Sequence, residues 1–266
     1  MKKLIGIIVT LFLITGFVAA QDTLYIYKAG IVIRKHAVNN IDSISFTYRP
    51  PATGTVTDID GNVYHWITIG TQKWLVENLK TTKFCNGESI SNVTDVTLWT
   101  NANFAAMCDY DNLTSNGTKY GHLYNYYAVV DTRKIAPSGC HVASDAEWTT
   151  LLNYLIANGF NYDGTTVDNK IGKSLASISD WRTCTVTGAV GNDLTKNNRS
   201  GFTTLPAGYR WPDGTFTTIG EYSTWWSTTE SSTTYAWGRF LNYDFYYLNR
   251  DQCKKNYGFS IRCIKD

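Results

Sequence analysis

The stretch from Ser144 to Phe160, SDAEWTTLLNYLIANGF, has the sequence features of a complete amphipathic helix. Ser144 and Glu147 form an S-x-x-E capping box, in which each side chain satisfies a free backbone N–H of the first turn. The apolar residues then recur at helical spacing, and Asn158-Gly159 supplies the left-handed residue that commonly ends a helix. The residues predicted to form the buried face are Trp148, Leu151, Leu152, Leu155 and Ile156.

The segments on either side of this helix predict antiparallel strands. After Gly191, short strand-like runs are separated by turn residues, as in the WPDG sequence at residues 211–214. Upstream, the DGN sequence at residues 60–62 lies between two alternating runs and predicts a hairpin. Two shorter helices are expected over residues 122–130 and 168–178. Helices followed by antiparallel strands indicate an α+β fold.

The chain begins with the features of an exported protein. Two lysines precede an apolar run that ends in Val-Ala-Ala at residues 18–20, so residues 1–20 are predicted to be a signal peptide. The mature chain is therefore expected to be secreted or on the cell surface through the Sec pathway, or in the periplasm, with no further membrane-spanning segment. Residues 21–49 are predicted to form a small N-terminal β unit, residues 50–54 a linker with two prolines, and residues 55–266 the main domain.

The charge balance and the motif content exclude several classes of function. Removal of the signal takes away two of the 24 Lys and Arg residues and none of the 22 Asp and Glu residues, so positive and negative charges balance. Nucleic acids and anionic membranes select clustered positive charge, so neither is expected as a partner. The four histidines are scattered, and no zinc motif or nucleophile elbow occurs, so the chain is expected not to be an enzyme. No catalytic residue, metal site or cofactor is predicted.

All six cysteines lie in the exported part of the chain, where thiols oxidise. They are candidates for disulfide bridges, and some can remain free thiols. Spacing alone does not fix the pairing, because six cysteines allow about 15 connectivities. The candidates are Cys85, Cys108, Cys140, Cys184, Cys253 and Cys263.

The C-terminal stretch from Tyr235 to Tyr257 combines many aromatic rings with small polar side chains. Tyr and Trp offer large rigid contact surfaces, and Asn and Ser offer adaptable hydrogen bonds, which is the composition of recognition loops. A buried strand would not tolerate so many polar groups, so most of the residues from 243 to 250 are expected to be exposed. The residues predicted to bind a ligand are Tyr235, Trp237, Asn242, Tyr243, Asp244, Tyr246, Tyr247, Asn249 and Arg250.

Ordinary sheet packing is the alternative explanation for these rings, because aromatic residues favour strands. Trp225 and Trp226 are adjacent, so a strand would point them to opposite faces, and at least one is expected in the core. Phe240, Phe259 and Ile261 are also expected to be core residues.

Six blocks of the chain, in this order, resemble the Fibrobacter succinogenes major paralogous domain family of exported bacterial proteins. The resemblance covers about residues 55–266. The blocks are TVTDIDGNVYHWITIGTQKWLVENLKTTKF at 55–84, YGHLYNYYAVV at 120–130, PSGCHVASDAEW at 137–148, GFTTLPAGYR at 201–210, YSTWWSTTE at 222–230 and YGFSIRCIKD at 257–266.

This resemblance also carries implications for fold and disulfides. The helix block and the closing G-F-x-x-R are similar to those of formylglycine-generating enzymes, which implies a C-type-lectin-like fold whose two ends meet on paired strands. In the family, a Cys before the helix pairs with the Cys of the closing block, here Cys263. This chain has Ile135 at that Cys position and Cys140 at a usual Trp position. The reactive Cys pair of those enzymes has no counterpart, and the WPDG sequence lacks the acid or amide that calcium-dependent lectins place before Pro.

The stretch from Tyr235 to Tyr257 also resembles the variable strings in target proteins of diversity-generating retroelements, which precede a constant end such as GFSIRC. We therefore expect a non-catalytic binding module that recognises a glycan or a surface protein, with the character of a diversified adhesin-like receptor. The alternatives are a structural component of the cell envelope without a specific ligand and an enzyme of unknown chemistry.

Overall fold

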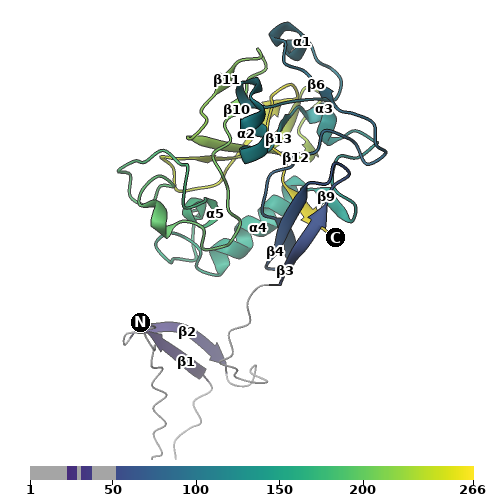
Figure 1. Ribbon diagram of the computed structural model, residues 1–266. Helices are drawn as coiled ribbons and strands as arrows, with labels where there is room; N and C mark the ends of the chain where they lie inside the picture. The colour runs from purple at the N-terminus through teal and green to yellow at the C-terminus, as the bar shows by residue number, and fades with distance from the viewer. Residues whose placement is uncertain (1–22, 29–30, 38–51) are drawn as a thin grey trace, which may run out of the picture. The chain divides into compact units, whose positions relative to one another are not determined.

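The structure, a computed structural model, describes residues 23–28, 31–37 and 52–266 (Figure 1). The chain divides into two units, Met1–Pro50 and Pro51–Asp266. In the first unit, β1 (Thr23–Lys28) and β2 (Ile31–Ala37) form an antiparallel pair where the small β unit is predicted. The predicted signal peptide and residues 38–49 of the predicted β unit lie outside the described residues. No helix in the described ranges is long and apolar enough to cross a membrane.

A five-stranded antiparallel sheet joins the beginning and the end of the second unit. Its strand order is β3-β4-β5-β15-β9, and Figure 1 shows the C-terminus beside the β3–β4 hairpin. The strands are β3 (Thr53–Thr57), β4 (Val63–Ile69), β5 (Gln72–Leu75), β15 (Cys263–Lys265) and β9 (Cys140–Val142). Strand β3 therefore begins inside the segment predicted as a linker, and the two ends of the domain meet in one sheet.

The hairpin predicted at residues 60–62 is confirmed. Gly61 takes a positive φ of 86°, which a glycine adopts without steric cost. The Asp58 carboxylate closes the turn by accepting hydrogen bonds from the backbone N–H groups of Asp60 and Asn62, at 3.0 and 2.9 Å. The Asp58 side chain thus fixes the turn between β3 and β4.

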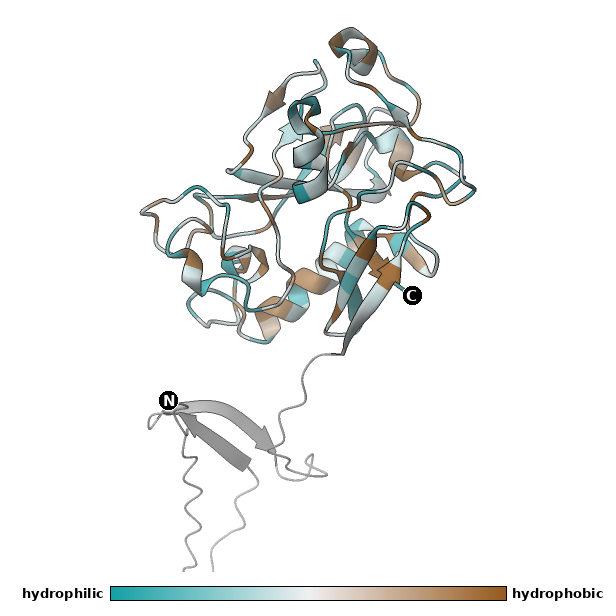
Figure 2. Ribbon diagram, in the orientation of Figure 1, coloured by the Kyte–Doolittle hydropathy of each residue, from teal (hydrophilic) through white to brown (hydrophobic). Residues whose placement is uncertain are grey.

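Helix α4 (Asp145–Ala157) has the capping box and the buried face that the sequence predicts. The Ser144 hydroxyl accepts from the Glu147 N–H, and the Glu147 carboxylate accepts from the Ser144 N–H at 2.8 Å. Trp148, Leu151 and Leu155 are fully buried, and the two remaining predicted core residues are partly buried. Figure 2 shows hydrophobic and hydrophilic residues alternating along α4, as one buried face requires.

The helix predicted at residues 122–130 is mostly wrong. Leu123 and Tyr124 form a strand, and only Tyr126–Val129 is helical. Asn125 separates the two, because its side-chain oxygen accepts from the N–H of Ala128 and so caps the helix. Aromatic and apolar residues are buried on both sides of this short segment, so their helical spacing did not identify one buried face.

The helix predicted at residues 168–178 is also much shorter, since only Gly172–Leu175 is helical. Gly172 lies against the backbone of Tyr246, where an added Cβ would be 2.9 Å from the carbonyl carbon. The flanking residues bond to distant segments and not to the next helical turn: the Asn169 side chain donates to the Leu248 carbonyl at 2.8 Å. Tertiary contacts thus replace the predicted helix.

A three-stranded antiparallel sheet separates two hydrophobic clusters. Its order is β12-β13-β14, with β12 at Tyr222–Glu230, β13 at Tyr235–Asn242 and β14 at Asn249–Lys254. The adjacent Trp225 and Trp226 are both fully buried on opposite faces, so both belong to the core. Phe259 and Ile261 are buried as expected, whereas Phe240 is only partly buried.

Short helices and strands complete a mixed α+β fold that consists mostly of sheet. Strand β6 pairs parallel with β7, and β7 pairs antiparallel with β8. Strands β10 and β11 form a separate two-stranded ribbon. These elements are β6 (Ser91–Asn92), α1 (Val96–Thr100), β7 (Ala106–Cys108), η2 (Tyr110–Asn112), α2 (Thr114–Tyr120), β8 (Leu123–Tyr124), α3 (Tyr126–Val129), α5 (Gly172–Leu175), η3 (Leu194–Lys196), β10 (Tyr209–Arg210) and β11 (Phe216–Thr217).

Candidate ligand-binding site

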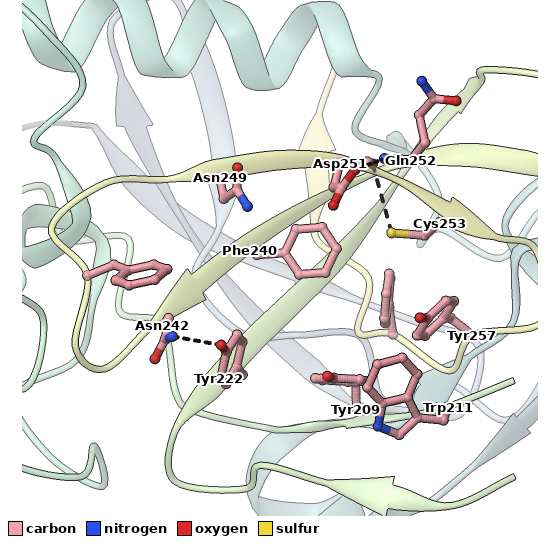
Figure 3. Close-up of a pocket in the computed structure, with 12 residues that line it drawn as sticks. Tyr209, Trp211, Tyr222, Phe240, Asn242, Asn249, Asp251, Gln252, Cys253 and Tyr257 are labelled. Carbon is pink, nitrogen blue, oxygen red and sulfur yellow. Dashed lines mark hydrogen bonds between the residues drawn. The ribbon is translucent and has the colours of Figure 1, made fainter. Parts of the chain in front are cut away.

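The residues predicted to bind a ligand are divided between the two faces of the sheet β12-β13-β14. Alternate residues of a strand point to opposite faces, and paired residues of neighbouring strands point to the same face. The pairing therefore puts the predicted residues Asn242 and Asn249 on one face, and Trp237 and Arg250 on the other. Asp251, which the sequence did not predict as a site residue, lies on the same face as the two asparagines. The face with the asparagines is hollowed, and the volume of this cavity is about 240 Å³ (Figure 3).

Aromatic rings form most of this cavity, which we call the aromatic hollow. The ring centroids of Tyr209 and Trp211 are 5.3 Å apart, as are those of Trp211 and Tyr257. Figure 3 shows Phe240 of β13 on the other side of the hollow from Tyr209 and Trp211. Because the rings pack on one another at tilted or edge-on angles, the wall is already formed before any ligand arrives. The rings that line it are Tyr209, Trp211, Tyr222, Phe240, Phe245, Tyr257 and Phe259.

The polar groups of the aromatic hollow are of two kinds. Asn242 is 7% exposed, and its amide nitrogen donates to the Tyr222 hydroxyl at 2.7 Å, so it is tied down within the wall. Asn249 and Asp251 are exposed at the rim. Within the described part of the chain, the Asn249 amide nitrogen and one Asp251 carboxylate oxygen have no hydrogen-bond partner.

The electrostatics of the aromatic hollow favour a ligand without negative charge. Asp251 is on its rim, and none of the described residues that line it is Lys, Arg or His. Burial raises the pKa of Tyr209 and of Tyr257 to about 12, so both hydroxyls stay protonated near neutral pH.

Arg210 holds the aromatic wall in place from behind. Its side chain is fully buried and donates to three backbone carbonyl oxygens, at 2.6, 2.9 and 3.1 Å. The backbones of Arg210 and Gly258 exchange hydrogen bonds of 3.0 and 2.8 Å in an antiparallel bridge. Trp211 and Tyr257 therefore lie opposite each other on two short segments.

The other face of the sheet uses its predicted site residues for packing. The Arg250 guanidinium lies 3.3 Å from the Trp237 ring centroid and donates to both carboxylate oxygens of Asp145, at 2.9 to 3.0 Å. The buried Arg239 donates to the same carboxylate at 2.7 Å. Burial opposes the charge of Asp145, but the two guanidinium groups outweigh it and hold its pKa below the ordinary value. Arg239 and Arg250 thus connect the sheet to α4, and Trp237 packs against Arg250.

The tyrosines of the β13–β14 connection lie outside the aromatic hollow. Tyr246 is exposed, as are Asn249 and Arg250, whereas Tyr243 and Asp244 are half-buried. The Tyr243 ring lies beneath the Arg182 guanidinium at 5.1 Å. The backbone of the connection is fixed by hydrogen bonds to residues 172, 190 and 191. Two further predicted site residues, Tyr247 and Tyr235, are half-buried away from the aromatic hollow.

The residues predicted from the sequence to bind a ligand include neither Asp251 nor the rings of Tyr209 and Trp211. The two rings come from the GYRWPDG sequence, which predicts a strand followed by a turn. The sequence does contain a pattern that indicates these rings. Tyr209 and Trp211 flank a polar residue, and Tyr257 and Phe259 flank a glycine, which is the alternation of a strand with one aromatic face. That alternation predicts two aromatic faces, but it does not show that the two faces meet.

A second polar cluster lies at the start of α4. The Nδ1 atom of His141 is 2.5 Å from Asp266, and its Nε2 atom is 2.7 Å from Glu147. Burial would lower the pKa of His141, but the two carboxylates raise it above the ordinary value. The Ser144 hydroxyl donates to Glu147 and not to the ring, as part of the capping box of α4. Within the described ranges, no group of three or more His, Cys, Asp or Glu side chains could hold a metal ion.

All six cysteines carry free thiols, so the expected bridges are not present in the structure. Cys140 and Cys263 lie on the paired strands β9 and β15, but Cys263 is opposite Val142 and Cys140 is opposite Lys265. Such diagonal neighbours are about 7–8 Å apart, beyond the usual span of a disulfide of about 6.8 Å. Burial raises the pKa of the Cys140 thiol to about 11 and that of Cys108 to about 12, which keeps both protonated.

Comparison with known proteins adds a family to this description. A model of the Fibrobacter succinogenes major domain matches residues 67–265, which include the whole of the aromatic hollow. Searches of the curated proteins and of the solved structures gave no match. Because the match covers well over half of its residues, the chain belongs to the Fibrobacter succinogenes major domain family.

Proposed function

We propose that this chain is an exported, non-catalytic binding module that recognises an uncharged glycan in the aromatic hollow. The observation that carries the proposal is the combination of a preformed aromatic wall with polar groups at its rim that have no internal partner. Asn249 and Asp251 supply those groups, and Arg210 fixes the wall from behind.

The chemistry of a sugar fits this arrangement. A pyranose ring presents an apolar face of C–H groups, which suits the rings of Trp211 and Tyr257, and an edge of hydroxyl groups. The Asn249 amide can donate to a hydroxyl, and the Asp251 carboxylate can accept from one. The cavity of about 240 Å³ is smaller than the range of roughly 300–1,000 Å³ that holds drug-sized ligands. It suits a single sugar unit.

The proposal extends to scaffold and location. We propose a C-type-lectin-like scaffold, displayed outside the cytoplasm, that binds without calcium. The meeting of β3 and β15 in one sheet supports this scaffold. The resemblance to retroelement targets adds that the segment from Tyr235 to Tyr257 is diversified. Sequencing this locus across strains tests that addition: it requires a template repeat and a reverse transcriptase gene nearby.

The test is a glycan array probed with residues 21–266, with and without a chelator. The test variant combines Asn249→Ala and Asp251→Ala, which together remove the unpaired polar atoms of the aromatic hollow. Tyr246→Ala is the control, because this ring is exposed on the same connection but does not line the hollow. We expect binding that survives chelation and Tyr246→Ala and is lost in the double variant.

Other outcomes separate the competing functions. Binding to purified surface proteins but to no glycan, with the same dependence on the hollow, would replace the glycan by a protein ligand. Binding to nothing, together with self-association of the purified chain, would favour a structural component of the envelope. Glycan binding that disappears with the chelator would remove the calcium-independent mechanism.

A further inference from the structure

A second cavity lies against the aromatic hollow and shares its wall. Its volume is about 480 Å³, and Trp211, Gln252 and Tyr257 line both cavities. The second cavity extends from the WPDG turn to the start of β13 and the end of β14. The residues that line only this cavity include Thr100, Asp213, Tyr235, Lys254 and Asn256.

The shared wall consists of one pair of rings and Gln252. Trp211 and Tyr257 lie opposite each other beside the Arg210–Gly258 bridge, with ring centroids 5.3 Å apart. Trp211 is 38% exposed, unusually high for so large an apolar ring. It therefore offers an accessible surface at the boundary of the two cavities, where one continuous ligand could contact it while it occupies both.

The second cavity has its own polar groups and no excess of charge. Asp213 brings a carboxylate, of which one oxygen accepts from the N–H and the hydroxyl of Thr215. Lys254 is exposed and brings one ammonium group. The Asn256 amide nitrogen is occupied by weak bonds to two backbone oxygens, at 3.2 and 3.4 Å. One carboxylate and one ammonium group balance, so this cavity also favours an uncharged polar ligand.

We propose that the two cavities are adjacent subsites for consecutive units of one linear, uncharged oligosaccharide, with Trp211 stacked against the sugar at their boundary. This inference rests on the proposed glycan function and makes it more specific. The ligand is then an internal segment of a glycan chain and not a terminal monosaccharide.

Calorimetric titration with sugars of increasing length tests this inference. The probes are the one-, two- and four-unit oligomers of β-1,4-linked glucose, mannose and N-acetylglucosamine. For the series that binds, we expect the four-unit oligomer to bind about tenfold to 100-fold more tightly than the single sugar, since the second subsite is reached without a second association step. Lys254→Ser should reduce this gain and leave the affinity for the single sugar unchanged.

The variants distinguish failure of this inference from failure of the proposed function. Trp211→Ala should remove most of the gain with length, and Trp211→Phe should keep part of it, which rules out misfolding as the cause. Equal affinity for one and four units, with binding still lost in the Asn249→Ala, Asp251→Ala double variant, would overturn the two-subsite inference and leave the glycan function standing. Absence of binding to every probe of every length would overturn both.

Discussion

The two faces of the sheet β12-β13-β14 carry similar side chains but differ in where the polar groups find partners. On the face toward α4, Arg239 and Arg250 both donate to Asp145. On the face with the aromatic hollow, Asn249 and Asp251 keep polar atoms that no described residue satisfies. Similar aromatic and polar side chains therefore pack against α4 on one face and, in our proposal, bind a ligand on the other. The two faces differ in whether their polar atoms have a hydrogen-bond partner within the described residues.

The largest effect is expected at the centre of the packing face. Asp145→Asn leaves the buried Arg239 without its counter-ion, so the free energy of unfolding should fall by about 3 kcal/mol. Urea denaturation measures this loss, and Asp251→Asn on the other face is the isosteric control. The pKa of Asp145 is lowered in the folded state, so its contribution is present above pH 3.8 and is lost as the pH falls through the folded-state pKa. Equal losses of stability in Asp145→Asn and Asp251→Asn would contradict the difference between the two faces.

A smaller loss is expected from the aromatic residue of the same face. Trp237→Ala removes a half-buried ring and its contact with the Arg250 guanidinium, which should cost about 2 kcal/mol of stability. Ligand binding should be unchanged, although the sequence placed Trp237 among the ligand-binding residues. Tyr246→Ala is the matched control and should leave the melting temperature nearly unchanged. A Trp237 variant that folds with full stability and binds no ligand would return this ring to the site.

The pH dependence of the His141 cluster should be weaker still. The pKa of His141 is raised in the folded state, so its stabilising contribution is complete below 6.5 and is lost as the pH rises through the folded-state pKa. The ring and both carboxylates are partly exposed, so the contribution should not exceed about 1 kcal/mol. Thermal denaturation between pH 5 and 9, about the range of histidine titration, should show this loss in the parent chain. His141→Gln should not show it.

The smallest effect on stability is expected on the face with the aromatic hollow. Asn249→Ala and Asp251→Ala remove exposed side chains that each accept one hydrogen bond, from the N–H of the next residue, so the free energy of unfolding should change by less than about 0.5 kcal/mol. The same variants should lose ligand binding. Substitutions on the face toward α4 should therefore reduce stability and spare binding, whereas those on the face with the aromatic hollow should reduce binding and spare stability. A large loss of stability in either variant would show that these groups serve the fold.

Local physics made several elements predictable from the sequence. The capping box of Ser144 and Glu147 fixed the start of α4, and the glycine at 61 fixed a hairpin. The adjacency of Trp225 and Trp226 predicted rings on opposite faces, although both proved to be buried. Each of these features depends on residues close together in the chain, where the backbone geometry is nearly determined.

The aromatic hollow depends on contacts that no local pattern contains. Its wall exists because Arg210 pairs with Gly258, two residues far apart in the sequence. The division of the predicted site residues between two faces depends on the register of β14 against β13, which the sequence does not show. The predictions of the two shorter helices were wrong for a related reason. Side chains such as that of Asn125 form hydrogen bonds to segments distant in the sequence, here residues 104 and 106.

The meeting of β3 and β15 in one sheet determines how the domain responds to mechanical load. Figure 1 shows the C-terminus beside the β3–β4 hairpin, with β10 and β11 at a distance from both. A pulling force applied between the two ends of the domain would be carried by the hydrogen bonds of the β3–β4, β4–β5 and β5–β15 pairs. The aromatic hollow beside β10 is lined by none of these strands, so a ligand that binds there, as we propose, would lie off the direct path of the force.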